Sequence, residues 1–151
     1  MSIPRVYFAN IYHDRKSKKW IAELPDFPNI NTYGNTKEHA VQMAQEALEA
    51  SLTEDFERNN ELPQPSRKGN EQILLSLKVY VAYWIRGGRN HLGISQSEMA
   101  KRMGISQQTY QKLERPGHSN PTVETLEKIS EALGGSIDFH LAIKEKKRMG
   151  A

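Results

Sequence analysis

The sequence predicts an α+β fold in two parts: a small antiparallel sheet with one long helix, then an all-α domain that ends in a strand. Three observations support this prediction. Apolar residues alternate with polar ones in short segments before residue 34, from residue 72 and again near the end of the chain. In residues 36–56 and 79–134 they recur every three or four positions, as in amphipathic helices. A polar loop with two prolines, residues 59–71, separates the two parts.

Four segments of the first part have the alternation of strands, residues 5–13, 20–24, 30–33 and 72–78. The sequence Pro-Asp-Phe-Pro at 25–28 must be a turn, because proline cannot donate to a sheet ladder. The first domain is therefore predicted to span residues 1–78, with the loop inside it.

One long helix is predicted between the third and fourth strands. Thr36 is a suitable N-cap, and Glu38 lies in the first turn, where a negative charge is favourable. A single apolar stripe then runs for about five turns. It consists of Val41, Ala44, Ala47, Leu48, Leu52 and Phe56.

Residues 96–113 predict two short helices joined by a tight turn. Ser95 and Glu98 have the spacing of a capping box, and Ser106 is placed to cap the second helix. Gly104 falls just past the first helix, where a left-handed conformation suits glycine. The side chains expected to support the pair from inside are Met99, Ala100, Met103, Ile105, Tyr110 and Leu113. This pattern is typical of a helix-turn-helix DNA-binding unit.

The outer face of the second short helix is rich in hydrogen-bonding side chains. Glutamine can bond both N7 and N6 of adenine in the major groove, and Gln96 could fix the register by bonding a phosphate. A glutamine-rich solvated helix in an ordinary bundle is the alternative. The predicted DNA-binding residues are Gln96, Ser106, Gln107, Gln108, Thr109, Gln111 and Lys112.

The rest of the second domain, residues 79–143, contains another helix from Pro121-Thr122 to Gly134 and then an alternating segment. Ser136 to Ile143 is predicted to be a strand at a two-fold interface of a homo-oligomer, a dimer or a tetramer. Residues 144–151 form a mostly basic tail.

Charge is unevenly distributed along the chain. Residues 1–70 carry nine Lys and Arg against ten Asp and Glu, whereas residues 71–151 carry twelve against eight, which favours a polyanionic partner for the second half. The chain has no cysteine, no apolar stretch near the ~20 residues that span a bilayer, and no signal-peptide pattern at its start. We therefore expect a cytoplasmic protein without disulfides or a membrane partner.

Residues 79–134 resemble the lambda-repressor-like (Xre) family in the order of these elements. The resemblance implies that Gln96 contacts phosphate and that Gln107 and Gln108 contact bases. One departure is Tyr110, where a β-branched residue is usual. The other is Gly87-Gly88 in the presumed first helix of the domain, whose end we expect to be irregular because two glycines cost it roughly 2 kcal/mol.

The whole chain resembles the HicB antitoxin family. The motifs are a strand ending in PDFP at 25–28, GNTKEHA at 34–40, AQEAL at 44–48 and LPQPS at 62–66, followed by the helix-turn-helix. The resemblance implies a partial ribonuclease-H-like fold without that enzyme's activity, a HicA-type RNA-cleaving toxin as partner, and binding of double-stranded operator DNA to repress its own operon. A stand-alone transcription regulator with an N-terminal sensing domain is the alternative.

The toxin surface is predicted at an acidic, aromatic edge that would complement a basic partner. Its candidate residues are Trp20, Glu23, Asp26 and Phe27. Packing of Trp20 and Phe27 in the small core is the competing interpretation.

We expect neither enzymatic activity nor a cofactor. Asp14, Glu23 and Asp26 are the only acids near the predicted strands, and they do not cluster as two-metal catalysis requires. The five histidines are dispersed without metal-ligand spacing, so no metal site is expected.

Overall fold

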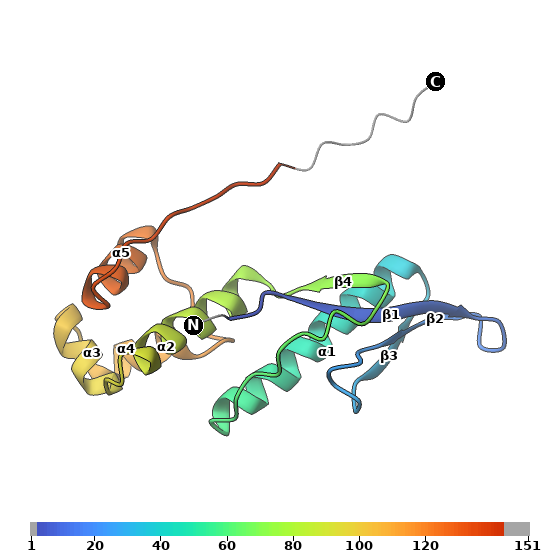
Figure 1. Ribbon diagram of the computed structural model, residues 1–151, viewed down its shortest axis with the longest axis horizontal. Coiled ribbons are helices and arrows are strands. Elements are labelled where there is room, and N and C mark those ends of the chain that lie inside the picture. Colours follow the sequence, from blue (N-terminus) through green and yellow to red (C-terminus); the bar gives the residue numbers. More distant parts are fainter. Residues whose placement is uncertain (1–2, 144–151) are drawn as a thin grey trace.

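A computed structural model gives the structure, which describes residues 3–143. The molecule is elongated, with a sheet and one long helix toward one end and a group of short helices toward the other (Figure 1). In chain order the elements are β1 (Val6–Asp14), β2 (Lys19–Glu23), β3 (Asn31–Gly34), α1 (Lys37–Glu57), β4 (Glu71–Leu74), α2 (Leu77–His91), α3 (Gln96–Met103), α4 (Gln107–Glu114) and α5 (Val123–Ala132). The predicted α+β class is confirmed.

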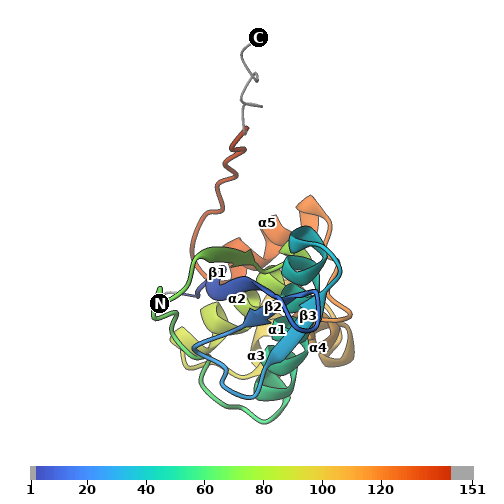
Figure 2. The ribbon, with the colours of Figure 1, turned by 90° about the vertical axis from the view of Figure 1, so that its right-hand side faces the viewer.

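The four strands form one antiparallel sheet in the order β3-β2-β1-β4. Alternation along β1 turns Tyr7, Ala9 and Ile11 into the core, where they pack beneath α1. Val6, Phe8, Asn10 and Tyr12 point to the opposite face, as the two-residue period requires. Seen from the end of the molecule, α1 crosses one side of the sheet (Figure 2).

Helix α1 begins and packs as predicted. The Thr36 hydroxyl accepts a hydrogen bond from the His39 amide at 3.1 Å, which caps the helix. Gly34 lies so close to this first turn that a Cβ there would collide with the α1 backbone. The fully buried side chains of the helix follow its 3.6-residue period and are Ala40, Ala44, Leu48 and Leu52.

The predicted loop between α1 and β4 is fastened to the sheet. The Tyr7 hydroxyl donates to the Pro63 carbonyl at 2.8 Å. The Asn70 side chain accepts from the Ile11 amide at 2.8 Å and donates to the Ile11 carbonyl at 3.0 Å, so it imitates a strand partner. A Cβ on Gly69 would lie 2.8 Å from the Ala9 carbonyl oxygen, which explains a glycine at this close approach.

The fourth strand is shorter than predicted. Residues 72–78 were expected to be extended, but β4 ends at Leu74 and α2 begins at Leu77. The Ser76 hydroxyl accepts from the Val79 amide at 3.4 Å, so a helix cap stands where the strand was expected to continue.

Helix α2 belongs to both halves of the molecule. Val79 and Tyr83, in its first half, pack into the core beneath α1. Ile85, further along, is buried with α3, α4 and α5. The expected irregularity at Gly87-Gly88 is wrong, because α2 continues to His91. A Cβ on Gly88 would lie 2.8 Å from Leu133 Cδ1, so this glycine serves close packing.

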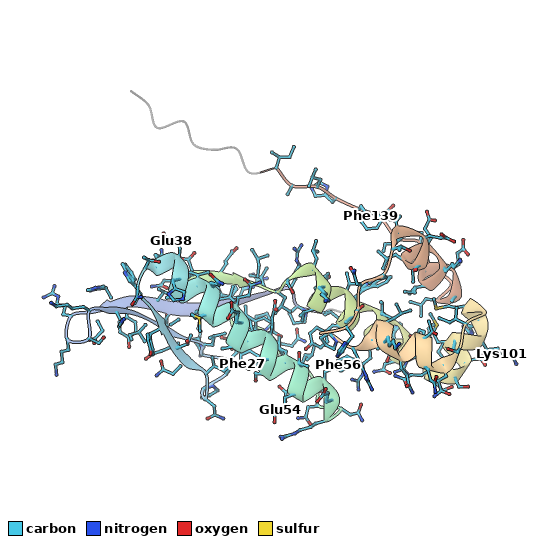
Figure 3. The ribbon with its side chains drawn as sticks, turned by 180° about the vertical axis from the view of Figure 1, so that it is seen from behind. Phe27, Glu38, Glu54, Phe56, Lys101 and Phe139 are labelled. Atoms are coloured by element: carbon cyan, nitrogen blue, oxygen red, sulfur yellow. The ribbon has the colours of Figure 1, made fainter. Side chains whose placement is uncertain are left out.

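The single chain does not form the predicted C-terminal strand. Residues 136–143 form no strand, and beyond Ile137 their apolar side chains are exposed, Phe139 at 68%, Leu141 at 84% and Ile143 at 81%. Figure 3 shows Phe139 on a segment that leaves α5. A strand needs a hydrogen-bonded neighbour, and this segment has none among residues 3–143. The basic tail predicted at 144–151 lies outside the described residues.

Candidate nucleic-acid interface and partner surface

The helix-turn-helix consists of α3, a tight turn and α4, and its predicted caps are formed. The Ser95 hydroxyl accepts from the Glu98 amide at 3.0 Å, and the Ser106 hydroxyl accepts from the Thr109 amide at 3.1 Å. Gly104 adopts the left-handed conformation with φ of 67°. These three features hold the two short helices at a fixed angle, which a helix presented to a groove requires.

The surface of α4 divides the predicted DNA-binding residues into two groups. Gln107, Gln108 and Lys112 are exposed. The Ser106 and Thr109 hydroxyls lie 2.8 Å apart and hydrogen-bond to each other at the start of the helix, and Gln111 is half-buried. The unit lies at the end of the molecule opposite the β1–β2 hairpin (Figure 1).

Beneath this surface lies a buried carboxylate. Glu114 is 1% exposed and receives two hydrogen bonds from the Arg89 guanidinium, at 2.6 and 3.0 Å. The Tyr110 hydroxyl donates to it at 2.7 Å and the Gln96 amide at 2.9 Å. One carboxylate thus joins α2, α3 and α4, and so connects both helices of the helix-turn-helix to the helix before them.

The environment of Glu114 favours its ionised form. Burial opposes the negative charge, but the donors Arg89, Gln96 and Tyr110 outweigh burial and hold the pKa of Glu114 below its ordinary value. The pKa of Tyr110 is raised, because its phenol is buried beside that carboxylate. The network is therefore an ionised pair, with a neutral phenol and an amide as additional donors.

Gln96 is not the free surface side chain that the sequence had suggested. One N–H of its amide bonds to Glu114, and the side chain is half-buried. A carboxamide carries two N–H donors, so the predicted phosphate contact depends on the second. Sequence reasoning missed Arg89 and Glu114. The one signal in the sequence was Tyr110, which stands where the Xre family usually has a β-branched residue. Its hydroxyl can reach a polar partner one helical turn away, and in the structure that partner is Glu114.

The four candidate toxin contacts do not share one surface. Phe27 is 7% exposed and packs edge-on against Tyr7 at 5.3 Å, which supports the core interpretation for this residue. Trp20 is half-buried and packs edge-on against His13 at 5.4 Å. The Asp26 carboxylate accepts from the Ser66 amide at 3.0 Å, and Glu23 accepts from the Tyr12 hydroxyl at 3.0 Å.

A third feature of the structure is the joint between the two halves. The Arg86 guanidinium lies 3.9 Å from the centre of the Phe56 ring, donates to the Phe56 carbonyl at 2.7 Å and also bonds to Asn59. Phe56 in turn packs edge-on against Tyr83 at 5.3 Å. Figure 3 shows Phe56 where the end of α1 meets the helical half. A hollow of about 660 Å³ lies here, lined from both halves, including Glu57, Arg86 and Gln111.

The described part of the chain offers neither a metal site nor a membrane-spanning helix. Within residues 3–143 no group of three or more His, Cys, Asp or Glu side chains is placed to hold a metal ion. Over the same residues no helix is both long enough and apolar enough to cross a membrane.

Comparison with known proteins agrees with this division into two parts. The sequence model of the HicB_like antitoxin of bacterial toxin–antitoxin systems matches residues 6–85, more than half of the chain. The chain belongs to the HicB-like antitoxin family. A helix-turn-helix model matches residues 80–140, so the two matches meet within α2.

Named relatives extend over most of the sequence. Antitoxin HicB 2 of Photorhabdus laumondii is 28% identical over 88% of this chain and 94% of its own length. Antitoxin HicB 1 of the same organism is 29% identical over 81% of this chain and 78% of its own length. An uncharacterized HTH-type transcriptional regulator of Sinorhizobium fredii is 48% identical over 48 residues, which are 32% of this chain and 61% of that protein.

Proposed function

We propose that this antitoxin neutralises a HicA-type RNA-cleaving toxin by binding it, and that it represses its own operon by binding double-stranded operator DNA in the cytoplasm. The observation that supports the proposal best is the direct connection of a HicB-like domain to a capped helix-turn-helix through one shared helix, α2. In this proposal the chain acts by binding and carries no catalytic group.

Operator recognition is assigned to α4. Gln107 and Gln108 read base edges, and Lys112 lies on the same exposed face. Gln107→Ala or Gln108→Ala should lower the preference for the operator over a single-base variant by roughly 1–3 kcal/mol at one position. Gln96→Ala should weaken binding to all duplexes similarly, with thermal unfolding measured in parallel because Gln96 also bonds Glu114. Affinity losses without any change in sequence preference in the two α4 variants would contradict this assignment.

A second copy of the chain is proposed as the partner of residues 136–143. Exposed Phe139, Leu141 and Ile143 alternate along an extended segment, and two such segments can complete each other as paired strands. Dimers of this type read half-sites about 34–36 Å apart, or multiples of that. Deleting the chain from Ser136 onward should give monomers by light scattering. Oligomers that survive the deletion would contradict this interface.

Toxin binding is assigned to the N-terminal domain, where Glu23 and Asp26 are the charged candidates. Glu23→Lys together with Asp26→Lys should abolish neutralisation, because both changes oppose a basic partner. Glu131→Lys, a charge reversal on exposed α5, is the matched control and should neutralise normally. Intact neutralisation by the double variant would exclude these two residues as toxin contacts. The test is co-expression with the protein encoded next to this gene, followed by pull-down and a growth assay.

A further inference from the structure

One face of the sheet is left uncovered. Helix α1 packs on the side that holds Tyr7, Ala9 and Ile11, and no other helix among residues 3–143 covers the opposite side. The exposed side chains on this open face include Tyr12 at 45% and Tyr33 at 60%. Apolar patches that are rimmed by polar residues often mark interaction sites.

The two tyrosines lie in one row across three strands. Tyr12 of β1 is paired with Ile21 of β2, and Ile21 is paired with Tyr33 of β3. Because neighbouring strands are about 4.8 Å apart, the two rings flank Ile21 at a separation of roughly 10 Å. The Tyr12 hydroxyl is fixed by its bond to Glu23, and Lys19 lies 5.9 Å from the centre of the Tyr33 ring. The rings therefore stand as two separate platforms with a cation beside one of them.

Positive charge borders the open face at both ends. The β1–β2 hairpin carries Arg15, Lys16, Lys18 and Lys19 against a single acid, Asp14, whose carboxylate accepts from the Ser17 amide. At the other end, a hollow of about 610 Å³ is lined by Arg5, Arg67 and the ring of Phe8. The described part of this face carries two carboxylates, Asp14 at the hairpin end and Glu23 nearer its centre.

We propose that this open face binds single-stranded RNA. Bases would stack on Tyr12 and Tyr33, and the phosphate backbone would run between the basic hairpin and the two arginines. Proteins that bind single strands combine aromatic platforms for the bases with positive charge along the path of the backbone. A basic protein partner would also meet Glu23 on this face, so it is the competing occupant that the test separates from RNA.

A polar row beside the tyrosines distinguishes RNA from DNA. Asn10, Glu23 and Asn31 are paired directly across the strands, one step along from the tyrosine row on the same face. Their amide and carboxylate groups offer donors and acceptors for a ribose 2′-hydroxyl, which DNA lacks. The face is distinct from the helix-turn-helix, which lies at the other end of the molecule (Figure 1).

The test measures binding of the full chain to a fluorescent oligouridine, to the matching single-stranded DNA and to the operator duplex. Tyr12→Ala with Tyr33→Ala should weaken RNA binding by at least roughly ten-fold, since each stacked base contributes about 1–3 kcal/mol. Arg15→Ala with Lys16→Ala should lower the salt dependence of RNA binding. Val123→Ala, which truncates an exposed apolar side chain on α5, is the control and should change nothing. Circular dichroism verifies that every variant is folded.

Two variants distinguish RNA binding at the open face from operator binding at the helix-turn-helix. Gln107→Ala with Gln108→Ala should impair operator binding and leave RNA binding intact, whereas the tyrosine variant should do the reverse. The inference is overturned if the chain does not bind the oligouridine, if the tyrosine variant binds it as well as the parent does, or if DNA of the same sequence binds equally. Loss of toxin capture in the tyrosine variant, with RNA binding unchanged, would identify a protein interface instead.

Discussion

Removing the buried carboxylate of Glu114 is the sharpest perturbation of the helix-turn-helix. Glu114→Ala leaves the Arg89 guanidinium, whose side chain is only 12% exposed, without its partner, and it strands the Tyr110 hydroxyl in the core. Removing one member of a buried ion pair typically costs about 3–5 kcal/mol, because the remaining charge stays desolvated. A domain of this size has a total free energy of unfolding of the same order. The substitution should therefore remove most of the stability of the domain that contains α3 and α4.

The expected effect can be measured by thermal unfolding. For a domain of 60–100 residues, about 3 kcal/mol corresponds to a fall in Tm of roughly 12–24 °C. Operator binding at the growth temperature should fall with the folded fraction, although Glu114 itself is buried. The matched control is Glu124→Gln, which breaks the exposed pair between Glu124 and Lys128 and should cost less than about 1 kcal/mol.

A second variant separates the loss of an ion pair from the loss of packing. Arg89→Met together with Glu114→Leu replaces both charges by apolar groups of similar size, and such exchanges are often close to neutral. It should therefore recover much of the stability that Glu114→Ala loses, apart from the contribution of the Tyr110 and Gln96 donors. A cost below 1 kcal/mol for Glu114→Ala, or equal losses in the single and double variants, would refute the view that this charge pair organises the three helices.

Further predictions concern acid, the glycine contact and the joint. Because the pKa of Glu114 is lowered in the folded chain, its contribution to stability is present above its ordinary value of 4.5 and is lost as the pH falls through the lower folded value. Acid titration followed by circular dichroism should show this loss in the parent and not in Glu114→Gln. Gly34→Ala should lower the free energy of unfolding by about 1–3 kcal/mol or more, since its Cβ would meet the α1 backbone, whereas Gly117→Ala meets nothing within 4 Å and should be close to neutral. Arg86→Ala should separate the unfolding of the two halves in calorimetry, because it removes the contacts to Phe56; a single unchanged transition would contradict that role.

Much of this structure is readable from the sequence because local chemistry and tertiary packing agree. The caps at Ser95 and Ser106, the turn at Gly104 and the stripe along α1 are each determined by a few neighbouring residues. The same holds for the alternation that places one side of β1 in the core.

The features that the sequence did not predict all depend on contacts between residues that are distant in the chain. Gly88 is tolerated within α2 because Leu133, far along the chain, packs against it. The pairing of Arg89 with Glu114 joins residues 25 positions apart, and no local pattern shows it. The segment 136–143 failed as a strand for a related reason, because its alternation requires a neighbour that the single chain does not provide.

The candidate toxin surface shows the limit of reading single residues. Phe27 stands in a conspicuous motif, yet it packs against Tyr7 in the core. Composition alone does not reveal which aromatic residues fill a small core and which remain exposed. The register of the sheet does, because it places Tyr12 and Tyr33 together on the open side.

The most direct test of the account measures toxin neutralisation and operon repression in the same cells. The protein encoded next to this gene is expressed with the parent chain or with Gln107→Ala and Gln108→Ala, while growth and an operator-driven reporter are recorded. The account predicts that the parent restores growth and silences the reporter, and that the variant restores growth without silencing it. Failure of the parent to restore growth, with repression intact, would contradict the antitoxin function and favour a stand-alone regulator. Loss of both activities in a folded variant would contradict the division between the two domains.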